Sequence, residues 1–439
     1  MAGSAVESSR APSAWKGWEQ RIRQVTGCRI CGNRRLRPVV DLGAQCLASL
    51  FDDGKPENHL QTRVPLQVVR CEPEAGAQGC RFVQLTRTVP PEVLYHDYGY
   101  RSGINATMRR HLQDLAQEIE SRIPLRRGDI VVDIGANDGT TLLAYRSEGI
   151  LRVGYEPSNI RPGTAQDGLV YIPTVFRAGE FHSRFPGNTA RVVTSIAMFY
   201  DIDDPARFCQ EVHGLLSEDG VWIIEMSYLG AMLDHHSFDA ICHEHLGYYS
   251  LATLEHLMQR AGFVFCDVAF NDANGGSIRC YAQKASSPMP VPAANRQRIQ
   301  QALQDERDKG YHDERTFAQF RRHVEETREA LQQTLERLRG EGKRVFGYGA
   351  STKGNVVLQY AQVGPQHLTA IADRNPAKVG RMTLGTNIRI CSEDEMRRAR
   401  PEYLVILPWH FLEEFLQREQ ALRASGTKFI VPFPDVRIV

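Results

Sequence analysis

The sequence lacks a strong charge of one sign. Its 53 Lys and Arg residues nearly balance its 52 Asp and Glu residues, which leaves a formal net charge of +1. Proteins that bind mainly through nucleic-acid phosphates or through an anionic membrane surface carry a clear positive excess. We therefore expect neither nucleic acid nor membrane as a partner.

Long hydrophobic runs are also absent. A membrane-spanning helix needs about 18 or more apolar residues in a row, and the longest candidate, residues 221–233, is interrupted by Glu225. Residues 1–25 are polar, with no apolar core followed by a cleavage site, so they show no secretion signal. We expect a cytoplasmic protein whose first 25 residues form a flexible tail.

The ten cysteines are too few for a disulfide scaffold in 439 residues, but their placement is informative. Cys28 and Cys31 have the spacing of one half of a zinc knuckle, and Cys71 and Cys80 can supply two further ligands. Four thiolates leave no open coordination position, so the pattern predicts a structural zinc ion. Cys46 is a rival ligand, and a set of reduced thiols without metal is the alternative.

A glycine-containing turn follows a predicted buried strand near residue 130. Asp133 ends that strand, and Gly135 and Gly139 allow the backbone to turn tightly and approach a ligand. The next predicted strand, residues 151–156, ends at Glu156. An acidic residue about 20 positions after a glycine turn can accept hydrogen bonds from both ribose hydroxyls. The spacing departs from G-x-G-x-x-G, which disfavours a dinucleotide.

Helix and strand patterns alternate from about residue 105 to residue 285, as in a doubly wound α/β domain. A strand at residues 192–196 leads into an acidic loop, and residues 215–226 form a turn and a fifth strand. In this order of parts the chain resembles a class I S-adenosylmethionine methyltransferase. The resemblance implies a cofactor site that comprises Asp133, Gly135, Asn137, Gly139, Glu156, Pro157, Ser158, Ile196 and Ala197.

Two histidines flank a carboxylate in the segment that follows the fifth strand, in the run His243-Glu244-His245. Side chains of adjacent residues diverge and rarely chelate one metal ion. The three residues could instead be buried structural groups, or one histidine could be a general base, since histidine titrates near neutrality. Their place after a strand end, where α/β folds bind ligands, favours a functional site. The residues alone leave the structural and the catalytic interpretation open.

A second strand-turn-helix unit begins after a Pro-rich break at residues 286–294 and a long helical segment. One face of this helical segment is predicted to be apolar and to pack on its own domain; it carries Phe317, Phe320, Val324, Leu331, Leu335 and Leu338. Residues 344–354 read Arg-Val-Phe-Gly-Tyr-Gly-Ala-Ser-Thr-Lys-Gly, a nucleotide-binding-like pattern. A C-terminal dehydrogenase is one interpretation, but Thr352 occupies the place of the third glycine of a dinucleotide motif. No dedicated hydride-transfer residues are visible.

Taken together, the motifs resemble those of the nucleotide-sugar C-methyltransferases, which build branched deoxysugars. The resemblance rests on the four cysteines, the methyltransferase core, H-E-H-L-x-Y-Y-S, Asn-Gly-Gly-Ser-Ile-Arg at residues 274–279, and Gly-Tyr-Gly-Ala-Ser-Thr-Lys-Gly-Asn at residues 347–355. It covers about residues 26–435. It implies S-adenosylmethionine as methyl donor and a keto sugar on a nucleoside diphosphate as acceptor, methylated at a carbon that loses a proton next to the carbonyl.

The resemblance also implies residue roles. His245 matches the base, Glu244 lies beside it to orient or polarise, and His243 completes the predicted catalytic group. Ser351 and Lys353 would meet phosphates at a helix N-terminus. The predicted substrate-binding residues are Tyr98, Tyr100, Ser102, Asn274, Gly276, Ser277, Ser351 and Lys353. Cys242 stands where well-known antibiotic-pathway members have a tyrosine, so the sugar and the methylated carbon stay open.

The expected fold is α/β, with a class I methyltransferase sheet between a small zinc module and a C-terminal Rossmann-like domain. We expect a tail at 1–25, the zinc module at 26–95, the methyltransferase domain at 96–290, and a helical linker with the nucleotide-sugar-binding domain at 291–439. The expected assembly is a monomer or homodimer. The alternative activity is O- or N-methylation of another small molecule on the same scaffold.

An RNA-binding zinc protein is the interpretation from a different class. It rests on an arginine cluster near the first cysteines, namely Arg21, Arg23, Arg29, Arg34, Arg35 and Arg37. The near-zero net charge and the absence of an aromatic-rich basic tract disfavour it, and a solvated face explains the arginines equally well.

Overall fold

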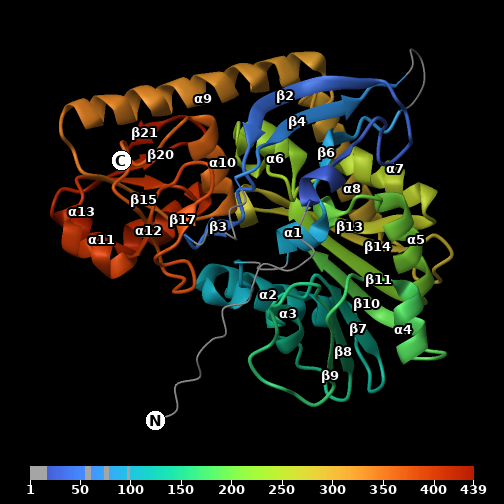
Figure 1. The fold of residues 1–439 in the computed structure, drawn as a ribbon. Helices are drawn as coiled ribbons and strands as arrows, with labels where there is room; N and C mark the ends of the chain where they lie inside the picture. The colour runs from blue at the N-terminus through green and yellow to red at the C-terminus, as the bar shows by residue number, and fades with distance from the viewer. Residues whose placement is uncertain (1–16, 55–60, 74–78, 96–98) are drawn as a thin grey trace, which may run out of the picture.

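A computed structural model describes residues 17–54, 61–73, 79–95 and 99–439 of the chain. A seven-stranded sheet forms its centre, in the order β13-β14-β11-β10-β7-β8-β9 (Figure 1). Five neighbouring strands are parallel: β7 (Ile130–Ile134), β8 (Leu151–Tyr155), β9 (Leu169–Ile172), β10 (Ala190–Ile196) and β11 (Leu216–Ser227). Antiparallel strands complete it: β13 (Phe263–Asn271) and β14 (Ser277–Lys284). This is the predicted doubly wound methyltransferase sheet.

Helices cover both faces of this sheet because its central strands are apolar on both sides. Val131 packs in the cluster that contains α2 (Ala106–Arg122), whereas the next residue, Val132, packs on the opposite side. Successive side chains of a strand point to opposite faces, so one buried run serves both layers. Asn105 caps α2 through hydrogen bonds from the backbone N–H groups of residues 107 and 108. The remaining helices are α3 (Thr140–Leu143), α4 (Ala178–Arg184), α5 (Pro205–Leu215), α6 (Leu229–Asp234) and α7 (Leu251–Arg260).

The N-terminal region forms an antiparallel sheet in the order β12-β5-β4-β2. Three strands come from this region: β2 (Leu36–Gln45), β4 (Val64–Cys71) and β5 (Val83–Leu85). The fourth, β12 (Gly247–Tyr248), belongs to the segment that follows the two histidines and pairs with β5. The sheet of the N-terminal region therefore includes a strand from the predicted methyltransferase domain. Nearby lie β1 (Arg23–Gln24), which pairs with β6 (Arg87–Thr88), and α1 (Pro91–Tyr95).

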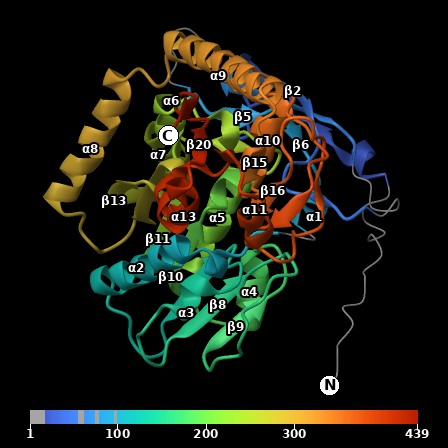
Figure 2. The same cartoon turned by 90° about the vertical axis from the view of Figure 1, so that its left-hand side faces the viewer.

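The C-terminal region begins with two helices, α8 (Ala293–Asp308) and α9 (Glu314–Gly340), which frame one side of the molecule (Figure 2). The apolar face predicted for α9 is buried within the same chain. A six-stranded α/β sheet follows, in the order β18-β16-β15-β19-β20-β21. Its strands are β15 (Val345–Tyr348), β16 (Ile371–Asp373), β18 (Ile390–Ser392), β19 (Tyr403–Ile406), β20 (Lys428–Val431) and β21 (Arg437–Ile438). Its helices are α10 (Thr352–Tyr360), α11 (Glu393–Ala399), α12 (Leu412–Arg418) and α13 (Gln420–Ala424).

The N-terminal and C-terminal regions also share a small sheet, because β3 (Phe51–Asp52) pairs with β17 (Met382–Thr383). The Gln359 side chain in α10 strengthens this contact. It accepts a hydrogen bond of 2.8 Å from the backbone N–H of Cys46 and donates one of 3.1 Å to the carbonyl of the same residue. In the part of the chain that the structure describes, no helix has the length and apolar character needed to cross a bilayer.

Candidate active site and metal centre

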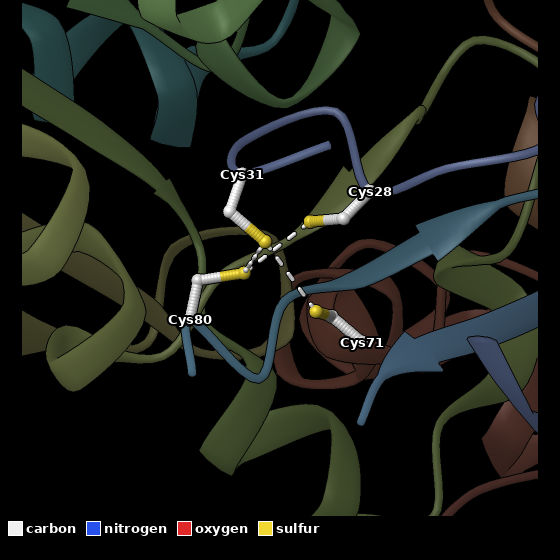
Figure 3. A group of neighbouring side chains, drawn as sticks. All are labelled: Cys28, Cys31, Cys71 and Cys80. Carbon is white, nitrogen blue, oxygen red and sulfur yellow. Dashed lines mark hydrogen bonds between the residues drawn. The ribbon is translucent and has the colours of Figure 1, made fainter. Parts of the chain in front are cut away.

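Four cysteine sulfurs converge beside the N-terminal sheet (Figure 3). The Sγ atom of Cys80 lies 3.3 Å from that of Cys28 and 3.4 Å from that of Cys31, which is 3.6 Å from the sulfur of Cys71. All four sulfurs lie within 4.8 Å of one another. A tetrahedral zinc ion with Zn–S bonds of about 2.3 Å holds its sulfurs about 3.8 Å apart. The arrangement fits the predicted zinc site with four cysteine ligands.

Local donors face these sulfurs. The backbone N–H of Ile30 and the side-chain amide of Asn33 each lie 3.4 Å from a sulfur, on Cys28 and Cys71 respectively. Such contacts steady thiolate ligands and partly neutralise their charge. The rival ligand Cys46 lies outside the group, where its sulfur contacts the carbonyl of Gln61 at 3.5 Å.

A cavity of about 870 Å³ lies where the methyltransferase sheet, the N-terminal region and the C-terminal region meet. Many of the residues predicted from the sequence line it: Tyr100, Ser102, Asp133, Gly135, Asn137, Glu156, Pro157, Ile196, Ala197, Glu244, His245, Asn274, Ser351 and Lys353. Others do not line it: Gly139, Ser158, His243, Gly276 and Ser277. Tyr98 lies outside the described residues. The cavity therefore brings together segments that are far apart in the chain, from Ser49 to Phe411.

The first wall of the cavity is the turn after β7. Asp133 is almost fully buried and accepts a hydrogen bond of 2.6 Å from the hydroxyl of Thr194. Burial raises the pKa of Asp133 to about 7, with the hydroxyl opposing the rise and the nearby carboxylate of Glu156 adding to it. Gly135 has a φ of 79°, and a Cβ there would lie 2.9 Å from Cγ of Met198. Only glycine fits this close turn.

Glu156 and Asn137 fix the shape of this wall. One Glu156 oxygen accepts the backbone N–H of Asn137 at 2.9 Å, and the other accepts that of Ser158 at 2.8 Å. The Asn137 side chain donates to the carbonyl of Tyr100 at 3.1 Å and accepts from the N–H of Ser102 at 2.9 Å. The loop that carries Tyr100 and Ser102 is thereby hydrogen-bonded directly to the glycine turn.

His245 forms part of the opposite wall. Its Nδ1 lies 2.7 Å from the carbonyl oxygen of Ala240. A carbonyl only accepts hydrogen bonds, so Nδ1 carries the proton of the neutral ring and Nε2 is the basic atom. Burial and, to a smaller extent, the cation of Lys353 lower the pKa of His245 to about 3, although the hydrogen bond to the Ala240 carbonyl opposes this shift. The ring packs on Tyr200 with centroids 4.2 Å apart. The imidazole is therefore neutral, and its orientation is fixed.

His243 and Glu244, the other two residues of the His243-Glu244-His245 motif, have surroundings that differ from those of His245. His243 is 1% exposed, and its Nε2 contacts the carbonyl of Val64 at 3.1 Å, away from the cavity. Glu244 lines the cavity, yet neither carboxylate oxygen has a hydrogen-bond partner among the described residues. The carbonyl of Ala240, rather than Glu244, is the group that orients His245.

Two further groups beside Glu244 were not singled out by the sequence analysis. Asp201 lines the cavity with its Oδ1 unpartnered in the described part of the chain, and burial, with the nearby Glu244, raises its pKa far above the ordinary value. The ring of Tyr200 packs against that of His245 in a tilted arrangement. The acidic loop after β10 was the only signal for Asp201 and Tyr200. Burial, with both carboxyl groups nearby, also raises the pKa of Cys242, so its thiol stays protonated and is no nucleophile.

The C-terminal region supplies the third wall. Lys353, in the first turn of α10, donates a hydrogen bond of 2.7 Å to the carbonyl of Asn274. Ser351 caps the same helix by accepting the N–H of Gly354 at 3.0 Å. His410 and Lys378 also line the cavity, and neither was predicted from the sequence.

A hydrogen bond of 3.0 Å from the indole of Trp409 to Asp239 connects the C-terminal region to the segment that carries His245. The two regions are thereby held together at the edge of the cavity.

Three known protein families match successive parts of the chain. Residues 28–95 match a zinc binding domain, residues 100–267 a methyltransferase domain, and residues 272–434 the C-methyltransferase C-terminal domain. The chain is thus an S-adenosylmethionine-dependent methyltransferase with a four-cysteine zinc site. It belongs to the family of C-methyltransferases that combine these three parts. A member of that family, C-methyltransferase NovU of Streptomyces niveus, is 32% identical over 421 residues, which span 95% of this chain and 98% of NovU.

Two solved methyltransferase structures each match part of this chain. The plantazolicin methyltransferase BpumL, bound to a substrate analogue and SAH, is 11% identical and matches 42% of this chain and 87% of its own, with a TM-score of 0.34. Magnesium protoporphyrin IX methyltransferase from Synechocystis PCC 6803, with bound SAH, is 12% identical and matches 41% of this chain and 88% of its own, with a TM-score of 0.31.

Proposed function

We propose that this C-methyltransferase transfers a methyl group to a carbon next to the carbonyl of a keto sugar carried on a nucleoside diphosphate. One observation carries the proposal. The Nδ1 atom of His245 is hydrogen-bonded to the Ala240 carbonyl, and His245 lines the same cavity as Gly135 and Lys353. A neutral base, the predicted cofactor wall and a cation from the C-terminal region thus line one cavity.

Carbon is a poor nucleophile until a base removes a neighbouring proton. In the proposed reaction, Nε2 of His245 takes the proton from the carbon beside the carbonyl, and the electron pair moves to the carbonyl oxygen. The carbon then forms its new bond to the methyl group as the sulfur–methyl bond breaks. S-adenosylmethionine, when bound, supplies this activated methyl, so the protein mainly has to align donor and acceptor. His245 finally releases its proton to solvent.

The residues around the glycine turn fit the cofactor. Asp133 and Gly135 would border its methionine part, Glu156 would hold the ribose, and Ala197 would line the pocket. Asn137, Pro157 and Ile196 reach the same wall of the cavity, and Ser158 fixes the Glu156 carboxylate through its backbone N–H. Gly139, predicted to border the methionine part as well, is the N-cap residue of α3 with a φ of 79° and does not line the cavity.

The acceptor would occupy the remaining space between the methyltransferase sheet and the C-terminal region. Tyr100 and Ser102 would close over it, Asn274 would lie near the sugar, and Ser351 with Lys353 would meet the phosphates at the start of α10. Gly276 and Ser277 do not line the cavity and would support the loop that carries Asn274. A Cβ on Gly276 would lie 2.4 Å from the Cβ of Ala231.

In this proposal the zinc module spans residues 26–95, the methyltransferase domain 96–290, and the helical linker with the nucleotide-sugar domain 291–439.

Calorimetric titration tests the proposal. The purified chain would be titrated with S-adenosylhomocysteine and then, in its presence, with TDP, GDP, CDP and UDP. We expect cofactor binding followed by selective binding of one nucleotide. Cofactor binding without any nucleotide response would contradict the nucleotide-sugar acceptor and favour O- or N-methylation of another small molecule.

A further inference from the structure

Arg29 lies inside the zinc-binding loop, between Cys28 and Cys31, yet its side chain points away from the sulfurs. The side chain is 3% exposed, which is unusual for a guanidinium. Its Nη1 donates to the carbonyl of Leu85 at 2.6 Å, its Nη2 to the hydroxyl of Thr88 at 2.9 Å, and its Nε to Asp203 at 3.4 Å. The zinc loop thus holds a buried cation against two other segments of the chain.

The first of these segments is the acidic loop after β10. Asp203 accepts hydrogen bonds from Arg29 and, at 3.0 Å, from Thr88 on one oxygen, and it pairs with Arg23 through the other. Three residues earlier in the same loop, Tyr200 packs against His245. Asp201, between these two positions, lines the cavity. Holding Asp203 therefore fixes the loop whose tyrosine packs on the proposed base.

The second segment is β5, which lies next to the strand that follows His245. Leu85 accepts the hydrogen bond from Arg29 on its carbonyl and donates its own N–H to the carbonyl of Leu246 at 3.0 Å. The neighbouring residue Gln84 is fully buried and reaches back to the zinc loop, where it accepts the N–H of Arg29 at 2.8 Å and donates to the carbonyl of Gly27 at 3.0 Å. Two hydrogen bonds in series connect Arg29 to the residue beside His245.

We propose that Arg29 is a positioning residue for His245, held in place by the zinc-binding loop that carries it. The arginine fixes both structures that flank the imidazole, namely the Tyr200 loop and the backbone at Leu246. The planar guanidinium suits this task because it presents several donors in a fixed fork, which a lysine ammonium does not. This inference rests on the proposed function of His245 as the base.

Arg29→Gln is the informative variant, because glutamine keeps a polar side chain but cannot reach all three acceptors. Its matched control is Arg34→Gln, which changes an exposed arginine three residues after Cys31. We expect Arg29→Gln to keep one zinc per chain and to bind S-adenosylhomocysteine within about twofold of the unchanged protein. Hydrogen exchange followed by mass spectrometry should show amides of residues 199–204 and 243–249 exchanging about tenfold faster, with the seven-stranded sheet unchanged.

Catalysis supplies the second readout, with the nucleotide sugar that the unchanged enzyme methylates. The kcat of Arg29→Gln should fall at least about tenfold with little change in KM, Arg29→Lys should recover part of the loss, and Arg34→Gln should match the unchanged enzyme. Asp203→Asn, which leaves the zinc loop untouched, should lower kcat in the same way but less.

Three outcomes overturn the proposal: local exchange that does not change, exchange that rises throughout the protein, or a kcat equal to that of the control. If the unchanged enzyme methylates no nucleotide sugar, the proposed function fails instead, and the exchange experiment still decides whether Arg29 fixes the two segments.

Discussion

The Nδ1 atom of His245 lies 2.7 Å from the carbonyl oxygen of Ala240, five residues earlier in the chain. A turn of the backbone thus selects the tautomer of the imidazole and leaves Nε2 as its basic atom. The ring that results is neutral, packed on Tyr200, and part of the cavity wall. These are the properties required of a base that removes a proton from carbon near neutral pH.

Replacing His245 by Gln should lower kcat by at least about a thousandfold, because a glutamine amide cannot accept the proton from carbon as Nε2 of the imidazole would. Binding of S-adenosylhomocysteine should stay within about twofold, since the glycine turn lies on another wall. His243→Gln is the matched control and should keep most of the activity, because His243 is buried away from the cavity. Turnover assays and calorimetry on both variants check this, and near-normal turnover of His245→Gln would eliminate it as the base.

The pH profile should lack the loss of activity that an ordinary histidine base shows near pH 6.5. Burial lowers the pKa of His245 to about 3, so the ring becomes protonated only as the pH falls toward that value. At saturating cofactor, kcat should therefore stay level from pH 8 to pH 5. Lys353→Met removes a cation that lowers this pKa, so its acidic limb should move upward. An acidic limb near pH 6.5 in the unchanged enzyme would contradict this.

The four-cysteine site should hold one zinc ion per chain. Cys71→Ser should lose most of the metal and lower the apparent unfolding temperature by at least about 5 °C, because metal binding contributes directly to folding. Cys46→Ser should retain the zinc, since this residue lies outside the group of sulfurs. Elemental analysis and thermal unfolding measure both effects. Loss of zinc from Cys46→Ser, or its retention by Cys71→Ser, would refute the ligand assignment.

Glu156→Gln should weaken S-adenosylhomocysteine binding at least about tenfold, or about 1.4 kcal/mol. The amide cannot accept two backbone N–H groups and also receive ribose hydroxyls as the carboxylate can. Glu148→Gln, at an exposed position before β8, serves as the control. Calorimetry measures both affinities, and equal affinity in the two variants would remove Glu156 from the proposed cofactor site.

The sequence was sufficient to predict those parts of the structure that depend on local patterns. The four cysteines, the turn at Gly135 and the apolar face of α9 follow from spacing and periodicity, and the structure confirms the zinc-site, α/β and helix predictions made from them. The position of His245 after a strand end was likewise visible in the sequence. These features need only a few neighbouring residues to be recognised.

Contacts between distant segments could not be predicted in the same way. No local pattern relates the residues that join in three of these contacts. They are the pairing of β12 with β5, the packing of Tyr200 against His245, and the hydrogen bond from Arg29 to Asp203. The role of Ala240 depends on a backbone carbonyl, which every residue has, so its identity carries no signal. The structure was therefore necessary to show which neighbours orient the proposed base.

The most direct test of the account is deuterium exchange into the sugar. The enzyme would be incubated in D2O with S-adenosylhomocysteine, which cannot donate a methyl group, and with 4-keto-6-deoxyhexoses carried on TDP, GDP, CDP and UDP. The account predicts enzyme-dependent deuterium incorporation at the carbon beside the carbonyl of one of them, and none with His245→Gln. Methyl transfer to a sugar oxygen or nitrogen without such exchange would contradict it.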